Sequence, residues 1–528
     1  MSAGAPGPDP ALLPILAAFQ SGREAEGRAA LAALLAARPD HVEARALAAF
    51  LAVQAGEKET ARKHLAQASL HAPAHSTALN NLGLLAEDAE CDADEIVALF
   101  RRAALADPGD EVVADNLERV LVAKGLAPEL SPDEAEAFWR EETAAHPRLA
   151  GLWTGLGNRL LDAGDLAGAE EAFVRAARIR PERAETRVNL GIVRHRRSDP
   201  EAALRLYAEA EALETASGEG GPSAPLRWNR ALSRLILGDF AGGFADYEAR
   251  DYLGAYRRFD PARVPRWDGA PFPGKTLLLH AEQGFGDAIQ FVRYARIAKE
   301  RGGCVLLACP APLERLFARV PGVDAVVPTA ALDRTAFDLE APLLSLPRIA
   351  GTRLETVPAS VPYLYLDGIG GGSAPVRAPG PLRVGLVAAG NPKYGNDLRR
   401  SVPPALLAPL AAVPGIEWTG LHHGTPPGLP WLKEGLAGAA DFLDTALRMR
   451  ELDLVISVDT AAAHLAGALG LPVWVLLPAA PDWRWLRDRA DSPWYPTARL
   501  FRQRADGDWA GVVAAAAAAL STLSEEAR

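Results

Sequence analysis

The feature that most constrains this chain is an internal repeat in its first half. The clearest copy runs from 150 to 182. It has small residues where two helices would cross, aromatic residues to fill the groove between them, and a proline at its end. These residues are Trp153, Leu156, Gly157, Ala169, Phe173, Ala176 and Pro181, with Gly164 in the turn. Such helix pairs cannot bury their apolar faces alone, so several copies must stack into a solenoid.

Further copies occur in register on both sides of this one. They span 42–75 and 77–108 upstream and begin near Ala184 and Ala224 downstream, and weaker copies end near Pro39 and Pro147. We count about six or seven units, which resemble tetratricopeptide repeats in order and spacing. We therefore predict a repeat solenoid over 8–250. Its concave surface is expected to bind a protein or peptide, and a purely scaffolding or dimerising role is the alternative.

The second half alternates short apolar runs with helical patterns, after a connector at 251–274 rich in Pro, Arg and aromatic residues. Strands are expected at 275–280 and 304–309, separated by a glycine-rich turn and a helix over 288–301. This β-loop-α-β order is typical of a parallel, doubly wound sheet. It predicts a Rossmann-like domain over 275–366.

A second unit of the same kind is expected over 382–528, after a Gly-, Pro- and Ala-rich linker at 367–381. Its strands are predicted at 382–388, 416–422, 452–457 and 473–477, with a short helix ending near Leu469. The predicted fold class is thus α followed by α/β. Ligands in open parallel sheets bind at the carboxyl ends of the strands, so we expect the site in the cleft between the two domains.

Composition narrows the function. Lys and Arg number 56 against 67 Asp and Glu, a net charge of −11, which argues against a protein that coats nucleic acid. The three cysteines cannot form a disulfide framework, so a reducing compartment is expected. The start of the chain lacks a signal-peptide pattern, and no apolar run approaches the roughly 18 residues of a membrane span. These observations predict a cytoplasmic protein.

The first candidate binding motif follows the predicted strand at 452–457. Asp459 and Thr460 precede a helix, and His464 lies one turn further along the same face. With Thr460 as N-cap, the free backbone N–H groups and the positive end of the helix dipole would hold a phosphate. The alternative is that Asp459 only caps the helix and that His464 packs in an interface.

A second candidate lies in the other predicted domain. Gly284 and Gly286 would let the backbone approach a ligand closely, and Asp287 opens the next helix. A carboxylate there could remove a proton from an attacking hydroxyl. The alternative is an ordinary first-turn helix acid.

The segment from Asn391 to Ser401 supplies cations at the end of another strand. Asn391, Lys393 and Arg400 are its candidate contacts to an anionic donor, and a solvated loop is the alternative. Trp483, Trp485 and Trp494 would either wall the cleft or pack beneath the domain interface.

Taken together, four segments resemble the heptosyltransferase-like GT-B glycosyltransferases that are preceded by tetratricopeptide repeats. They are HAEQGFGDAIQFVRYA (280–295), NPKYGNDLRRS (391–401), DLVISVDTAAAHLAGALGLPVWVLLP (453–478) and PDWRWLRDRADSPWYPTARLFRQ (481–503). The resemblance implies a nucleotide-sugar substrate, an inverting reaction and no required metal or cofactor. It also implies Asp287 as catalytic base, Asp459, Thr460 and His464 as the donor motif, and Lys393 and Arg400 as phosphate contacts.

The chain departs from the related pattern in two places. Ala461 stands where heptosyltransferases commonly have glycine, and Tyr394-Gly395 where repeat-containing relatives often have His-Lys. In layout the chain is similar to O-GlcNAc transferases and to bacterial flagellin glycosyltransferases with repeats. That similarity implies a Ser or Thr hydroxyl on a protein as acceptor, with flagellin a candidate. A lipopolysaccharide or capsule glycan as acceptor, and a catalytically inactive repeat adaptor, are the alternatives.

Overall fold

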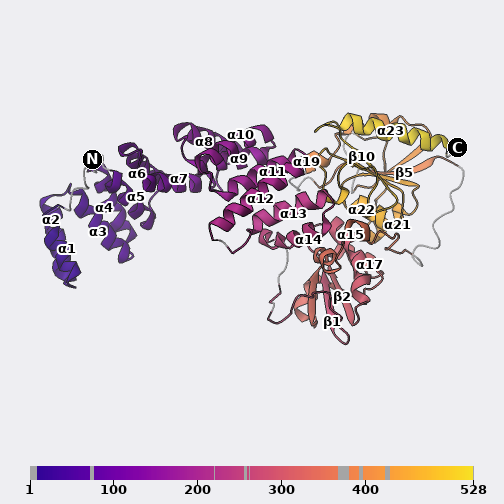
Figure 1. The fold of residues 1–528 in the computed structure, drawn as a ribbon, viewed down its shortest axis with the longest axis horizontal. Coiled ribbons are helices and arrows are strands. Elements are labelled where there is room, and N and C mark those ends of the chain that lie inside the picture. Colours follow the sequence, from indigo (N-terminus) through magenta and orange to yellow (C-terminus); the bar gives the residue numbers. More distant parts are fainter. Residues whose placement is uncertain are drawn as a thin grey trace. The chain divides into compact units, whose positions relative to one another are not determined.

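The computed structural model describes residues 9–71, 76–218, 220–254, 259–260, 262–366, 380–391, 397–422 and 429–526. The chain forms two compact units, 1–190 and 191–528, shown from indigo to yellow in Figure 1. The predicted fold class, an α-solenoid followed by α/β domains with parallel sheets, is confirmed.

The first unit consists of helices that pack in successive pairs (Figure 1). They are α1 (Leu13–Gln20), α2 (Glu24–Ala37), α3 (Val42–Gln54), α4 (Lys58–His71), α5 (Ser76–Asp88), α6 (Ala93–Ala106), α7 (Glu111–Gly125), α8 (Pro132–Ala145), α9 (Ala150–Ala163) and α10 (Leu166–Ile179). Helix α11 (Ala184–Arg196) crosses the boundary between the units.

The helix pairs pack through glycines, as the repeat pattern predicts. A Cβ atom on Gly157 would lie 2.5 Å from the ring of Phe173, so only glycine fits beneath this buried aromatic. Gly164 ends α9 with a φ of 86°, a conformation that favours glycine. Trp153 was predicted to share the groove, but it is only half-buried. Its indole N–H donates to the carbonyl of Pro147, and Arg175 lies over its ring.

The second unit begins before the end of the repeats. It contains α12 (Pro200–Ala216), α13 (Ala224–Ile236), α14 (Phe240–Tyr247) and the 3₁₀ helix η1 (Glu248–Leu253). The predicted solenoid extended to residue 250, whereas the compact unit starts at 191. The reason is packing: the rings of Phe240, Phe244 and Tyr247 lie 5.6–6.4 Å from that of Trp483.

The N-terminal lobe, 262–366, contains a four-stranded parallel sheet with the order β3-β2-β1-β4. Its elements are β1 (Thr276–His280), α15 (Phe285–Phe291), η2 (Val292–Tyr294), α16 (Ala295–Lys299), β2 (Cys304–Cys309), α17 (Ala311–Phe317), β3 (Ala325–Pro328), η3 (Thr329–Arg334), β4 (Leu339–Pro342), η4 (Leu343–Ser345), α18 (Leu346–Ile349) and η5 (Leu354–Thr356). The single helix predicted over 288–301 starts earlier, at Phe285, and tightens into η2 at its centre.

The C-terminal lobe, 380–526, contains a six-stranded parallel sheet with the order β10-β9-β8-β5-β6-β7. Its elements are β5 (Leu382–Val387), α19 (Asp397–Arg400), η6 (Pro404–Leu407), α20 (Ala408–Ala411), β6 (Ile416–Gly420), β7 (Lys433–Glu434), α21 (Phe442–Met449), β8 (Leu454–Val458), α22 (Ala461–Ala468), β9 (Val473–Leu477), η7 (Trp483–Trp485), β10 (Ala498–Arg502) and α23 (Trp509–Glu526). Of the predicted linker at 367–381, residues 367–379 lie outside the described residues.

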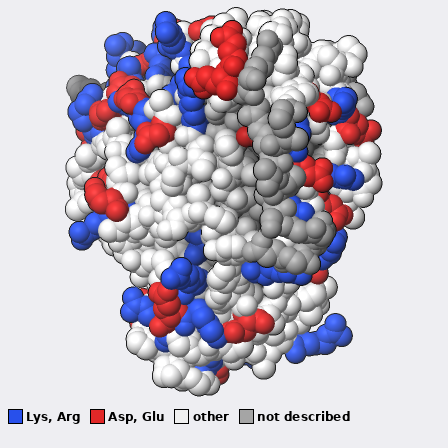
Figure 2. All heavy atoms as spheres, turned by 90° about the vertical axis from the view of Figure 1, so that its right-hand side faces the viewer, with Lys and Arg blue, Asp and Glu red and all other residues white. Residues whose placement is uncertain are grey.

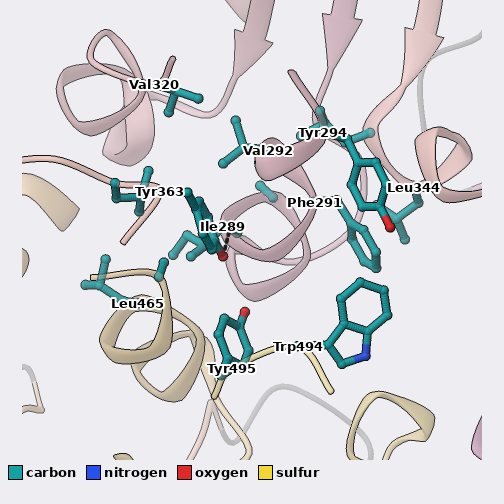
Figure 3. Close-up of a cluster of buried hydrophobic side chains, with 14 of the residues drawn as sticks. Ile289, Phe291, Val292, Tyr294, Val320, Leu344, Tyr363, Leu465, Trp494 and Tyr495 are labelled. Atoms are coloured by element: carbon teal, nitrogen blue, oxygen red, sulfur yellow. Dashed lines mark hydrogen bonds between the residues drawn. The ribbon is translucent and has the colours of Figure 1, made fainter. Parts of the chain in front are cut away.

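One apolar core runs through both lobes and the last helix pair of the repeats. Figure 3 shows its centre, where Phe291 from the N-terminal lobe and Leu465 and Trp494 from the C-terminal lobe belong to one cluster. The hydroxyl of Tyr363 donates to the carbonyl of Ile289 at 3.0 Å, the dashed line in the figure. Shared packing of this kind fixes the lobes against each other.

Buried Arg293 adds one polar link between the lobes and a second within the N-terminal lobe. Its guanidinium donates to the carbonyl of Trp494 at 2.8 Å and to the hydroxyl of Tyr363 at 2.9 Å. Trp483, Trp485 and Trp494 are all buried, so of the two alternatives for these rings the structure shows the packing role.

Charged side chains are mixed on the face drawn in Figure 2. Lysine and arginine alternate with aspartate and glutamate near the margin of this face, and much of its centre is uncharged. Among the described residues, no helix combines the length and the apolar character needed to span a bilayer.

Candidate functional site

The site is built where the loop after β1 meets the loop after β8. Helix α15 follows the first loop and packs against α22, which follows the second. A Cβ atom on Gly286 would lie 2.9 Å from Cδ2 of His464 and 3.5 Å from Cα of Ala461. The sequence predicted that the backbone at Gly286 approaches a ligand closely. In the structure it approaches the opposite lobe. The two candidate motifs, far apart in sequence, touch each other.

Asp287 lies in the first turn of α15, with its side chain 19% exposed. One carboxylate oxygen accepts a hydrogen bond from the backbone N–H of Gly284 at 2.9 Å, so Asp287 does cap its helix. The other oxygen forms an ion pair with Arg484 of the C-terminal lobe. Burial raises the pKa of Asp287, and Arg484 acts in the opposite direction.

Arg484 is the residue that sequence reasoning missed. Its guanidinium is bound between Asp287 and Asp482, with 2.8 Å to the latter, and lies 4.4 Å from the centre of the Trp483 ring. Burial opposes its charge, but the two carboxylates prevail and raise its pKa. The sequence signal that could have identified it is its position between Trp483 and Trp485, two residues after Asp482. An arginine so placed is an electrostatic partner and not a packing residue alone.

Thr460 and His464 are held by neighbours in their own lobe. Thr460 occupies the N-cap position of α22, but its hydroxyl contacts that of Ser457 at 3.1 Å, and it does not cap the helix as predicted. The imidazole of His464 stacks on Trp485 and hydrogen-bonds the hydroxyl of Tyr495 at 2.9 Å. Burial, with nearby Arg484 and Arg293, lowers the pKa of His464, so its ring is neutral at physiological pH.

Asp459 is a carboxyl whose pKa lies above its ordinary value. Burial and the nearby Asp482 raise its pKa to about 6, although Trp485, Arg484 and Arg400 act against the shift. Its Oδ1 lies 3.9 Å from Nε2 of His464. An additional anion close by would raise this pKa further, so anion binding here would be coupled to proton uptake.

Arg400 reaches the same motif from α19. Its guanidinium bonds Oδ1 of Asp397 at 3.0 Å and donates to the backbone carbonyl of Asp459, also at 3.0 Å. Asn391 is exposed beyond the end of β5. Lys393 and the dipeptide Tyr394-Gly395 lie outside the described residues. The structure therefore brings Asp287, Asp459, Thr460, His464 and Arg400 together.

A comparison with curated proteins gives the chain its family. Protein FlbA of Caulobacter vibrioides is 30% identical to it over 493 residues, which cover 85% of this chain and 79% of FlbA. The chain belongs to the FlbA family. A second protein of similar sequence is cellulose synthase 1 operon protein C of Komagataeibacter xylinus. It is 33% identical over 135 residues, 25% of this FlbA-family chain and 9% of that protein. No protein-family model matches the FlbA-family chain.

Solved structures of repeat proteins match parts of this FlbA-family protein. MamA from Desulfovibrio magneticus RS-1 is 19% identical. The match covers 34% of this chain and 97% of the MamA chain, with a TM-score of 0.24. PilF from Pseudomonas aeruginosa is 17% identical. The match covers 41% of this chain and 93% of the PilF chain, with a TM-score of 0.28.

The geometry of the FlbA-family site defines the chemistry available to it. It combines two carboxyls with raised pKa values, a neutral imidazole and two arginines, on segments that follow β1, β5, β8 and β9. Such a set can accept a proton from a weakly acidic hydroxyl and hold an anion beside it. Within the described ranges, no cluster of three or more His, Cys, Asp or Glu side chains is placed to hold a metal ion.

Proposed function

We propose that this FlbA-family protein transfers a sugar from a nucleotide-sugar donor to a Ser or Thr hydroxyl of a protein acceptor that the repeats recruit. The observation that carries the proposal is the contact between the Asp287 loop and the Asp459–His464 motif. This contact supports a role for Asp287 as base beside a phosphate site formed by the other lobe. Flagellin is a candidate acceptor because of the similarity in layout described above, and the cytoplasm is the proposed compartment.

In the proposed reaction Asp287 accepts the proton of the acceptor hydroxyl. The hydroxyl oxygen forms a bond to the anomeric carbon, and the bond from that carbon to the donor phosphate breaks. Direct attack from the opposite side inverts the anomeric centre. Asp287 can serve although both of its oxygens already accept one hydrogen bond, because each retains a second lone pair. Its raised pKa makes it a stronger base than an exposed aspartate.

The leaving nucleotide takes the electron pair of the broken bond and gains negative charge. Arg400 and the N-terminal amides of α22 are the groups we assign to stabilise it. No step in this scheme requires a metal ion or a cofactor.

The first test is calorimetric titration of the purified chain with CMP, UDP, GDP and ADP. We expect one nucleotide to bind selectively and His464→Ala to weaken it. Arg400→Ala should weaken binding at least about tenfold, the equivalent of about 1.4 kcal/mol. Arg399→Ala is the matched control, because it removes the neighbouring charge on the same helix, and it should stay within about twofold. Absence of binding by all four nucleotides would contradict the proposal.

The second test addresses the base. With the donor class identified by titration, Asp287→Ala should lower turnover at least about a hundredfold, the usual scale for a lost general base, and leave nucleotide affinity unchanged. Turnover at the wild-type rate would exclude this role for Asp287.

One observation favours a second candidate, an inactive adaptor that acts through the repeats alone. Arg484 already forms an ion pair with Asp287 and occupies the space between it and Asp482. If that pair never opens to a substrate, Asp287 serves only the structure. Nucleotide binding and turnover distinguish the two candidates directly.

A further inference from the structure

Unusual backbone conformations concentrate around the candidate site. Among the described residues five non-glycine residues have positive φ, and four of them lie here: Ser198 (61°), Gln283 (61°), Leu486 (53°) and Asp488 (54°). Gln283 precedes Asp287 by four residues, and Leu486 follows Arg484 by two. Side chains with a Cβ rarely adopt such conformations, which persist only where the surroundings hold them. The question is which contacts hold these two segments.

The segment that carries Arg484 is held by the turn between α11 and α12. Arg487 donates to both carboxylate oxygens of Glu201, at 2.9 and 3.0 Å, and to the carbonyl of Ser198 at 3.2 Å. The hydroxyl of Ser198 donates in turn to the carbonyl of Ala479 at 3.0 Å. We call Ser198, Glu201, Ala479 and Arg487 the clasp. It flanks Arg484 on both sides in the sequence.

The loop that carries Asp287 is held by the last helix pair of the repeats. Arg250 is completely buried and donates to Glu282 at 2.7 Å and to the hydroxyl of Ser345 at 2.8 Å. The hydroxyl of Tyr247 reaches the side chain of Gln283 at 3.4 Å, while its ring packs on Trp483. The final repeats therefore contact both of the segments whose side chains meet as the Asp287–Arg484 pair.

We propose that the last two helix pairs of the repeats belong to the catalytic apparatus, with Glu201 and Arg487 as positioning residues that keep Arg484 against Asp287. Their catalytic meaning rests on the proposed transferase, but the positioning itself does not. Arg484 in place favours the ionised form of Asp287 and orients its carboxylate. Without the clasp, the strained backbone at Leu486 and Asp488 can relax and carry Arg484 away.

The clasp is suited to experiment because its ion pair is accessible. The side chains of Arg487 and Glu201 are 27% and 47% exposed, so reversing a charge there does not bury an unpaired ion. We compare Glu201→Arg, Arg487→Glu and the double exchange of both in the full chain. Glu171→Arg is the matched control, since it breaks an exposed glutamate–arginine pair, Glu171–Arg175, elsewhere in the repeats.

The first readout is hydrogen exchange of the backbone over 479–490. Each single reversal should speed exchange there at least about fivefold, and the double exchange should restore it to within about twofold. The control should leave it unchanged. Unchanged exchange in both single variants would overturn the clasp.

The second readout is a pH titration of tryptophan fluorescence. We follow the midpoint of the component that is lost in Asp287→Asn, because that component reports on Asp287. Arg484 favours the ionised form of Asp287. Its displacement should therefore move the midpoint upward by at least about half a pH unit, and the double exchange should return it. Faster exchange with an unmoved midpoint would show a structural contact only and would overturn the positioning role.

Turnover separates this inference from the proposed function. With an active wild type, the single reversals should lower kcat at least about tenfold at unchanged nucleotide affinity, and the double exchange should recover it. A wild type without turnover whose fluorescence midpoint still moves and returns would overturn the transferase and leave the positioning of Arg484 standing.

Discussion

At the scale of single residues, Asp459 shows how a group in the candidate site lowers the free energy of unfolding as the pH rises. Its pKa rises from 3.8 to about 6, so the folded chain binds this proton more tightly than the unfolded chain. Its stabilising contribution is complete below pH 4 and is lost as the pH rises through 6. About two pH units correspond to at most about 3 kcal/mol.

Asp459→Asn removes this titration. We expect the variant to match the wild type at pH 4 and to exceed it in unfolding free energy by up to about 3 kcal/mol at pH 8. Urea unfolding at the two pH values measures the difference. Asp506→Asn, at an exposed carboxyl, is the control. A variant less stable than the wild type at pH 8 would show that the charged carboxylate stabilises the fold.

Gly286 makes a second prediction at this scale. In Gly286→Ala the new methyl group would lie 2.9 Å from His464, so one of the two loops must move. We expect a loss of about 1–2 kcal/mol in spite of alanine's better helix propensity. Thermal unfolding measures it, against Gly220→Ala, where a Cβ meets no atom within 4 Å. Equal melting temperatures for the two variants would show that the contact is loose.

The sequence predicted the candidate residues only where a local rule applied. Asp287 follows a strand of one parallel sheet, and Asp459 and His464 follow a strand of the other. In each sheet the carboxyl ends of the strands are where ligands bind, which is the rule that predicted them. Arg484 escaped because its partner Asp287 is 197 residues away, and no local pattern encodes that pairing. The hydroxyl of Thr460 likewise depends on Ser457, a neighbour whose orientation the sequence does not show.

At the scale of elements, one helix pair tests how the repeats are stabilised. Phe173 is fully buried against Gly157, whereas Trp153 is half-buried. Phe173→Ala should therefore cost about 3–5 kcal/mol by opening a cavity. Trp153→Ala should cost clearly less, about 1–2 kcal/mol, because it loses mainly one hydrogen bond and the contact with Arg175. Chemical unfolding followed by helical circular dichroism measures the stability loss of each variant. A larger loss for Trp153→Ala would show that Trp153 packs in the groove as predicted.

Most of the predicted strands are well buried, although β6 was predicted with two of its five residues buried and β4 was missed with three of four buried. The predicted strands that became β1, β2, β5, β8 and β9 are central or nearly so, with runs of buried apolar residues. Strand β3 is a run of four apolar residues with one of them buried, and arginines at two positions interrupt β10. The change from α15 to η2 occurs beside Arg293, which bonds the carbonyl of Trp494 in the other lobe, a contact that a helical pattern does not reveal.

At the scale of the molecule, the boundary between the units makes a prediction about truncation. A chain of 184–528 should fold, and a chain of 251–528 should aggregate. The shorter one lacks Phe240, Phe244 and Tyr247 over Trp483, and it leaves Glu282 buried without Arg250, a loss of about 3–5 kcal/mol. Size-exclusion chromatography and thermal unfolding compare the two. A monomeric chain of 251–528 with the same melting temperature as 184–528 would contradict this prediction.

The division at residue 190 also bears on how such proteins diversify. The apolar core of the α/β lobes includes repeat residues from Ala231 to Tyr247. Because each repeat interacts mainly with its neighbours, recombination can lengthen, shorten or exchange helix pairs of the first unit. The helices after it are fixed in place by residues such as Phe244 and Arg250. We therefore expect related chains to differ in the helix pairs of the first unit and to keep the remaining repeats together with the α/β half.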